Sequence, residues 1–190
     1  MHEIYHTEGF IVKAIPLKEA NMQIWLFTRE LGLIVATVQG VRKPTAKLRS
    51  HLIEYTLVSA DLVKGRDVWR LVSAEVIENP FVATYDELSA RSFIRALSLV
   101  GRLCGEEGGE PELFDHMKES MSVLALSQKE PKYFDTIVLW KILVILGYLP
   151  LSPNEEVLFK TPLADLGESS SDTIKLLIKN VEKAIKESHL

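Results

Sequence analysis

Cysteine is almost absent from this chain of 190 residues, in which Cys104 is the only one. A single cysteine excludes an intramolecular disulfide and a zinc site built from several thiolates. Because apolar residues such as Leu103 flank Cys104, we interpret it as a small buried side chain rather than a nucleophile. Among the five histidines, only His2 and His6 have a spacing typical of two metal ligands, and they precede a predicted strand rather than sharing a helix face. We therefore expect no metal and no other cofactor.

Long apolar runs are also missing. The apolar stretch 137–146 spans ten residues and includes Lys141, far short of the roughly 18 residues of a membrane span. The first residues lack the cationic and apolar regions of a signal peptide. We therefore expect a cytoplasmic protein with no membrane partner.

The motifs of catalysis are absent as well. No serine lies in a nucleophile-elbow sequence, and no glycine-rich phosphate loop follows a predicted strand. Neighbouring carboxylates such as Glu106 and Glu107 lie beside glycine, which is typical of solvated turns rather than of a catalytic pair. We therefore predict that the protein is not an enzyme.

Acidic residues are absent between Glu30 and Glu54, although the whole chain has a net charge of -4. Within this interval lie residues 40–50, which we call the basic loop; around Pro44 they carry Arg42, Lys43, Lys47 and Arg49. A glycine followed by a proline-containing run is typical of an exposed loop, and unpaired Lys and Arg are costly to bury. Such a loop is suited to the phosphates of a polyanion; the alternative is a solvated surface loop without a ligand.

The charge is unevenly distributed along the chain. Residues 1–80 contain ten Lys and Arg against nine Asp and Glu, whereas residues 81–190 contain twelve against seventeen. The change of sign, and a change of hydrophobic pattern after Pro80, indicate two parts with different partners. We expect a nucleic-acid-binding domain over residues 1–79 and a helical domain over residues 80–190.

The N-terminal part has the pattern of a small β-barrel. Apolar and polar residues alternate in runs of six to ten residues that are separated by turn residues, and this pattern predicts five strands. The predicted strands are residues 9–17, 22–28, 33–38, 55–63 and 68–77. Five strands at roughly ten-residue spacing, joined by turns, favour a closed barrel over a βαβ sheet.

The C-terminal part has helical periodicity. Residues 85–104, with Thr84 as cap, and residues 112–126 each predict an amphipathic helix. Residues 133–146 are apolar nearly all round, which favours a central buried helix, although the Val and Ile content leaves a strand open. A last helix is expected after Asp172, which we interpret as its cap.

Four aromatic residues lie on the predicted strands: Trp25, Phe27, Tyr55 and Trp69. A cationic groove with aromatic platforms is the general design of proteins that bind single-stranded nucleic acid, and any of these rings that faces outward could stack on a base. The alternative for each ring is the barrel core. Arg29, Lys64, Arg66 and Arg70 add charge to this part, and Glu30, Asp61 and Asp67 neutralise some of it.

Several short runs, taken in order, resemble the RecO family of bacterial recombination mediators. They are Thr7-Glu8-Gly9-Phe10-Ile11-Val12, Thr28-Arg29-Glu30-Leu31-Gly32, Gly40-Val41-Arg42-Lys43, Lys47-Leu48-Arg49 and, later, Gly147-Tyr148-Leu149-Pro150. The resemblance implies an OB-fold barrel followed by an all-α domain, an α+β protein that binds single- and double-stranded DNA and anneals complementary strands. It also implies work with RecR in loading recombinase onto DNA coated by single-stranded-DNA-binding protein, and hence association with the nucleoid.

One feature departs from this family. Many members carry a four-cysteine zinc module just after the Gly-Tyr-x-Pro sequence, whereas Leu151-Ser152-Pro153-Asn154 contains no cysteine. The zinc is therefore not carried over to this chain.

Our leading hypothesis from the sequence is a non-enzymatic DNA-binding and strand-annealing protein of repair. In it, phosphate is contacted by the four cations of the basic loop, helped by Arg29, Arg66 and Arg70. The alternative is a protein-interaction adaptor whose barrel binds a protein partner, since the helical half is acidic. A further expectation is a groove near Trp140 and Phe159 for the acidic, apolar C-terminal tail of single-stranded-DNA-binding protein, with Lys132 or Lys141 as its cation. The alternative for Trp140 is the core.

Overall fold

The computed structural model describes residues 3–43, 45–66, 68–83, 87–105, 108–126, 133–165 and 171–187. The chain divides into two compact units. The barrel unit consists of residues 1–80 together with residues 104–114, and the helical unit consists of residues 81–103 and 115–190.

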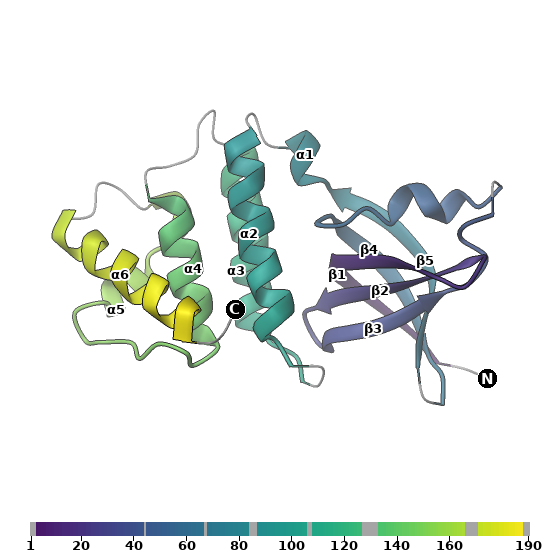
Figure 1. Ribbon diagram of the computed structural model, residues 1–190, viewed down its shortest axis with the longest axis horizontal. Coiled ribbons are helices and arrows are strands. Elements are labelled where there is room, and N and C mark those ends of the chain that lie inside the picture. Colours follow the sequence, from purple (N-terminus) through teal and green to yellow (C-terminus); the bar gives the residue numbers. More distant parts are fainter. Residues whose placement is uncertain are drawn as a thin grey trace. The chain divides into compact units, whose positions relative to one another are not determined.

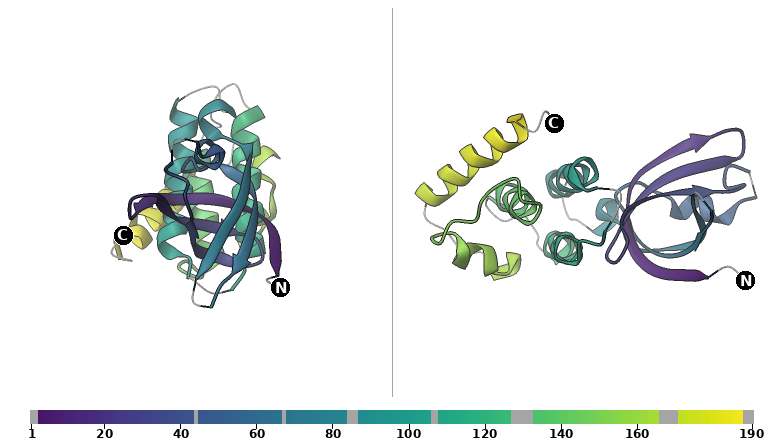
Figure 2. Two further views of the ribbon diagram at one scale, coloured as in Figure 1. Left: turned by 90° about the vertical axis from the view of Figure 1, so that its right-hand side faces the viewer. Right: turned by 90° about the horizontal axis from the view of Figure 1, so that it is seen from below.

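The barrel unit contains one five-stranded sheet that closes on itself (Figures 1 and 2). Its strands are β1 (Ile4–Leu17), β2 (Asn21–Thr28), β3 (Gly32–Val38), β4 (Leu57–Lys64) and β5 (Trp69–Glu78). They follow one another around the barrel in the order β1-β2-β3-β5-β4, and the closing β4–β1 contact is antiparallel. The β3–β5 contact alone is parallel and consists of two pairs, Ala36 with Trp69 and Thr37 with Arg70. The predicted five-stranded, OB-like barrel is thereby confirmed.

The alternation of side chains explains why these segments pair as they do. On β2, Ile24 and Leu26 are fully buried in the barrel interior, while Gln23 and Trp25, which alternate with them, lie on the outer face. On β3, Ile34 and Ala36 belong to the same core. The core therefore fixes the register, because a slip of one residue would turn every apolar side chain outward.

Two predicted strand limits differ from the observed ones. β1 begins at Ile4, five residues before the predicted start, because its first half pairs with β4 from Ile4 with Val63 onward. Tyr55 lies in a turn at φ 70° rather than on a strand. Its N–H donates to the carbonyl of Ile11 at 2.6 Å, so Tyr55 is held by β1 before β4 starts.

The connection between β3 and β4 carries the basic loop and the short helix η1 (Lys47–His51). Val41 and Leu52 are buried in the barrel core on either side of η1, and Leu48 packs against the same core. The ring nitrogen Nδ1 of His51 lies 2.8 Å from the carbonyl oxygen of Ala74 on β5. The loop is therefore anchored through its apolar residues, which leaves its charged residues on the surface. Pro44, predicted to interrupt it, lies outside the described residues.

Residues 104–114 complete the barrel unit by covering two aromatic side chains on its outer surface. Phe10 and Phe27 are fully buried, and their ring centroids lie 5.3 Å and 5.8 Å from that of Phe114. The approach of this segment depends on glycine: a Cβ at Gly109 would stand 2.5 Å from the carbonyl oxygen of Glu30. This close packing was not predicted from the sequence.

The helical unit is built mainly from four longer helices: α2 (Glu87–Leu103), α3 (Pro111–Leu126), α4 (Phe134–Ile145) and α6 (Ser171–Glu187). The shorter α1 (Pro80–Ala83) lies between β5 and α2, and α5 (Glu156–Lys160) and η2 (Leu163–Asp165) lie between α4 and α6. α4 is buried over nearly its whole length, so the predicted central segment is a helix and not a strand. α6 begins at Ser171, which puts Asp172 inside its first turn rather than at the cap, and Thr84 lies outside the described residues. No helix among the described residues has the length and apolarity needed to cross a membrane.

Candidate nucleic-acid interface

All four cations of the basic loop are exposed: Arg42, Lys43, Lys47 and Arg49. Within the described part of the chain, none of them forms an ion pair with a carboxylate. The nearest acid in the sequence that follows, Glu54, is engaged elsewhere, because its Oε1 accepts the N–H of Ala14 at 2.8 Å. The positive charge of the loop is thus left uncompensated and open to an anion.

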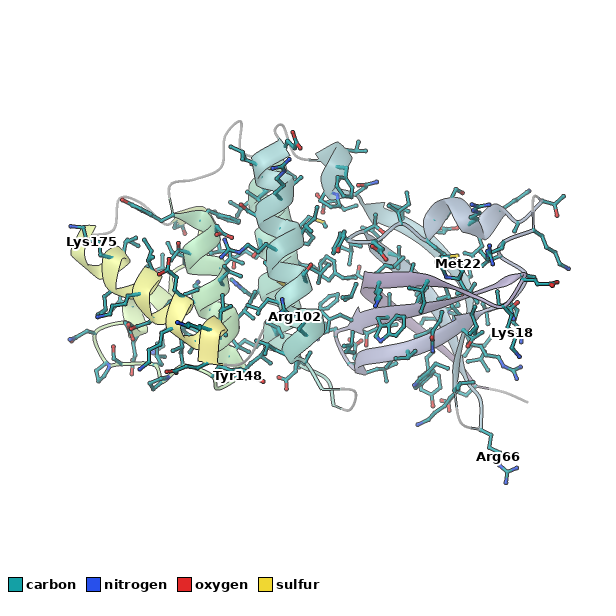
Figure 3. The ribbon with its side chains drawn as sticks, in the orientation of Figure 1. Lys18, Met22, Arg66, Arg102, Tyr148 and Lys175 are labelled. Atoms are coloured by element: carbon teal, nitrogen blue, oxygen red, sulfur yellow. The ribbon has the colours of Figure 1, made fainter. Side chains whose placement is uncertain are left out.

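The basic loop is joined to the turn between β1 and β2. The guanidinium of Arg42 donates to the carbonyl oxygen of Lys18 at 2.8 Å, and the backbone N–H of Arg42 donates to the carbonyl of Ala20 at 3.0 Å. Asn21 accepts the N–H of Gly40 through its side chain at 3.0 Å. These bonds bring the backbone of Lys18, an exposed cation labelled in Figure 3, next to the basic loop. The sequence did not indicate this neighbour, which precedes Arg42 by 24 residues.

A hollow of about 910 Å³ lies along the outer face of the barrel over β2 and β3. We call it the β2–β3 groove. From these two strands Gln23, Trp25, Val35 and Thr37 line it, and Lys64 and Trp69 border it from β4 and β5. This face of a five-stranded barrel of the OB type is the one that generally binds oligonucleotides.

The strand register arranges the groove in two cross-strand rows. One row consists of Lys13, Trp25 and Val35, and the other joins Gln23, Thr37 and Arg70. The ammonium of Lys13 lies 5.3 Å from the centre of the Trp25 ring, and that of Lys64 lies 5.4 Å from the centre of the Trp69 ring. Each tryptophan of the groove therefore has a cation over its ring.

The other predicted cations are distributed around the barrel. Arg70 extends the second row of the groove beside Thr37. Arg66 lies at the tip of the β4–β5 hairpin, where its side chain extends into solvent (Figure 3). Arg29 lies 4.0 Å from the carboxylate of Glu30, which also accepts the hydroxyl of Thr7 at 3.0 Å and lines one end of the groove. The groove thus has an acidic end at Glu30 and a basic side at Lys64 and Arg70.

The four aromatic candidates have different environments. Trp25 is half-buried on the outer face, and Trp69 is half-buried with its ring 5.1 Å from that of Tyr5 in an edge-to-face contact. Phe27 also faces outward but is fully covered, because Phe114 packs on it, so it offers no surface to a base. Tyr55 is not on a strand. Trp25 and Trp69 are the two that line the groove.

The opposite side of the barrel is acidic. On the outer face of β1, β4 and β5, Glu8, Ser59 and Glu75 form one row, and His6, Asp61 and Ser73 form the next. The Nδ1 atom of His6 lies 2.6 Å from a carboxylate oxygen of Asp61. The barrel thus segregates its charges between the groove side and the β1–β4 side.

Two buried ionisable groups, Cys104 and Lys141, are part of the packed interior and do not form a site. Burial, with a smaller contribution from Glu110, raises the pKa of the Cys104 thiol to about 11, which keeps it protonated and unreactive. Trp140 is only 1% exposed and is part of the helical core. The expectation that Lys141 offers a cation to a peptide is wrong: it is 5% exposed, and its ammonium donates to the carbonyl of Thr161 at 2.7 Å. Lys132 lies outside the described residues.

Comparison with known proteins identifies the barrel unit. Residues 1–80 match the family model described as recombination protein O N terminal. Residues 1–80 belong to the RecO family. A protein named DNA repair protein RecO from Gloeothece citriformis is 32% identical over 123 residues, which are 64% of this chain and 43% of that protein. A second so named, from Frankia casuarinae, is 29% identical over 150 residues, which are 76% of this chain and 60% of that protein.

The chain spans about half the length of the RecO relatives that it matches, and the family model covers its strands β1 to β5. The resemblance inferred from the short runs is thereby confirmed. The matched residues 1–80 contain the basic loop and the described part of the β2–β3 groove except Gly108.

Proposed function

We propose that this protein is a non-enzymatic DNA-binding protein of recombinational repair, which anneals complementary strands. The observation that carries the proposal is the group of four exposed cations in the basic loop, which have no carboxylate partners among the described residues. Membership of the RecO family, whose relatives are named DNA repair protein, supports it.

The proposed mechanism is electrostatic. Lys and Arg side chains that contact phosphates release condensed counterions, and contacts to the backbone leave the base edges free. Cations shared by two strands lower the mutual repulsion of the strands, so complementary bases meet more often. No bond is made or broken by the protein, and a site with catalytic residues is not needed.

The partners of the proposed function follow from the family. We propose that the protein acts with RecR to help load recombinase onto DNA that is coated by single-stranded-DNA-binding protein. The helical unit has a hollow of about 520 Å³ lined by Tyr148, Leu149, Pro150 and Lys183 together with the carboxylates of Glu155 and Glu187. The ammonium of Lys183 lies 3.7 Å from the carboxylate of Glu187, so the cation of this hollow is paired and the hollow does not suit an acidic peptide tail.

The test of DNA binding compares three proteins by fluorescence anisotropy of a labelled single-stranded oligonucleotide at several salt concentrations. The first is the parent, and the second carries Ala at Arg42, Lys43, Lys47 and Arg49. The third is a charge-matched control with Ala at four exposed lysines of α6: Lys175, Lys179, Lys183 and Lys186.

The loop variant is expected to bind more weakly, with a log-log salt slope shallower by about 2.8, since each single-strand phosphate contact contributes about 0.7. The α6 control has the same net charge as the loop variant and is expected to keep the slope of the parent. Annealing of two complementary oligonucleotides should slow in the loop variant alone. Equal slopes for all three proteins would contradict the loop as the DNA contact, and a parent that binds no DNA at low salt would favour the protein-interaction adaptor.

A further inference from the structure

Trp25 occupies a position that the packing of the barrel does not explain. The barrel core is complete without it, since Ile24 and Leu26 on either side point inward and Trp25 is not among the residues of the core. Its strand neighbours on the outer face are the polar Gln23 and the buried Phe27, and it lines the β2–β3 groove. Large aromatic surface that stays open to a groove is typical of a binding site.

The cations around Trp25 specify the chemistry of the ligand. Lys13 lies over the ring, and Lys64 lies over Trp69 on the other side of the groove. Neither lysine forms an ion pair with a carboxylate among the described residues. A ligand that fits this arrangement has flat, stackable rings joined by anionic groups at short intervals. A single strand of nucleic acid has both features, because each base is attached to a phosphate.

The contact between Lys13 and Trp25 does not prevent a base from stacking. A cation over an exposed aromatic ring is held weakly, and the lysine stem is flexible. When a base replaces the ammonium on the ring, the ammonium remains on the same side of the groove, close to the phosphate that follows. The polar pair Gln23 and Thr37, which face each other across β2 and β3, then lies next to the stacked base.

We propose that Trp25 is a base-stacking platform that makes the β2–β3 groove selective for single strands, while the basic loop binds single and double strands alike. In a duplex each base is already stacked and paired, so its face is not available to Trp25, whereas the phosphates remain available to the loop. This inference rests on the proposed function. It adds that a single strand in the β2–β3 groove is held with its bases facing Trp25. The strand must then leave the groove before it pairs with its complement.

The experiment measures binding of two fluorescent probes: an oligothymidine of about 15 nucleotides and a duplex of the same length, within the site size of one OB-type barrel. The variants are Trp25→Ala, Trp25→Phe and, as a matched truncation on the barrel away from the groove, Ile77→Ala. Ile77 is 48% exposed on β5 and does not line the groove. Circular dichroism establishes that each variant is folded.

Trp25→Ala is expected to weaken oligothymidine binding about ten- to a hundredfold and duplex binding less than about twofold. Its salt slope should match that of the parent, because no phosphate contact is lost. Trp25→Phe should recover most of the single-strand affinity, and Ile77→Ala should change neither probe. In a Trp69→Phe background, oligothymidine should also quench the fluorescence of Trp25, since the remaining Trp140 is buried.

Three results would overturn the inference while leaving the proposed function intact. They are unchanged single-strand affinity in Trp25→Ala, an equal loss for single strand and duplex, and no recovery in Trp25→Phe. If the parent instead binds neither probe at low salt, the proposed function itself fails, and the stacking platform fails with it. If Trp25→Ala does not fold, Trp25→Phe, Trp25→Leu and the quenching measurement still test the stacking platform. Leu keeps apolar volume without a flat ring. Trp25→Leu should therefore lose single-strand affinity, whereas Trp25→Phe should keep it.

Discussion

Phe114 is expected to hold the barrel unit together, and Phe114→Ala tests this. The ring is fully buried against Phe10 and Phe27, which themselves have no exposed surface. Truncation of a buried Phe costs about 3–5 kcal/mol, because the transfer free energy of the ring is lost and a cavity remains. Such a loss is a large part of the roughly 5–15 kcal/mol that stabilises a typical domain.

The assay combines guanidinium chloride unfolding with hydrogen exchange of the backbone amides. The denaturation midpoint should fall, and exchange should accelerate first in β1 and β2, the strands that carry Phe10 and Phe27. The control is Ile77→Ala, a truncation of a side chain that is 48% exposed, which should cost less than about 1 kcal/mol. A loss below about 1 kcal/mol for Phe114→Ala, or unchanged exchange in β1 and β2, would refute the reasoning.

Two more predictions concern single residues. Burial, followed by the smaller effect of Lys141, lowers the pKa of His116 to about 4, against the raising effect of its contact with the carbonyl of Val138. The folded state therefore binds fewer protons than the unfolded state, so the contribution of His116 to the free energy of unfolding is fully present above about pH 6.5 and falls by up to roughly 3 kcal/mol toward pH 4. In His116→Gln, the free energy of unfolding should depend less steeply on pH over this range. An equally steep dependence would contradict this origin. Arg42→Ala and Lys43→Ala each remove one exposed cation and should each reduce the single-strand salt slope by about 0.7. Only Arg42→Ala also loses the bond to Lys18, at a cost of about 0.5–1.5 kcal/mol in urea unfolding, and equal stability of the two variants would exclude a structural role for that bond.

The barrel was predictable because its signal is local. Alternation along β2 and β3 and the turns between strands indicate five strands, and the acid-free interval around Arg42 indicates an exposed cationic loop. The Lys13–Trp25 contact could also have been predicted from the sequence. With Leu17 and Asn21 closing the β1–β2 turn, antiparallel pairing places Lys13 opposite Trp25. The pattern within a single strand does not reveal this pair, because the pair depends on the register between two strands.

The remaining features depend on contacts between distant segments. Phe27 has the same outward position as Trp25, and only the return of the chain at Phe114 decides that one ring is covered and the other is open. Lys141 is a cation in an apolar stretch, and the sequence gives no sign that Thr161 satisfies its ammonium. The addition of Lys18 to the basic loop rests on a turn geometry that single-sequence patterns do not specify.

The unequal charge of the two sides of the barrel gives this unit a dipole moment. If the protein binds DNA as proposed, a barrel that approaches with the carboxylates of Glu8, Asp61 and Glu75 in front is repelled, and the same field rotates it until Lys13, Lys64 and Arg70 lead. Encounters are therefore oriented before any contact forms. The effect has the range of the Debye length, about 10 Å at 0.1 M salt, so added salt should slow association even where it leaves the bound geometry unchanged.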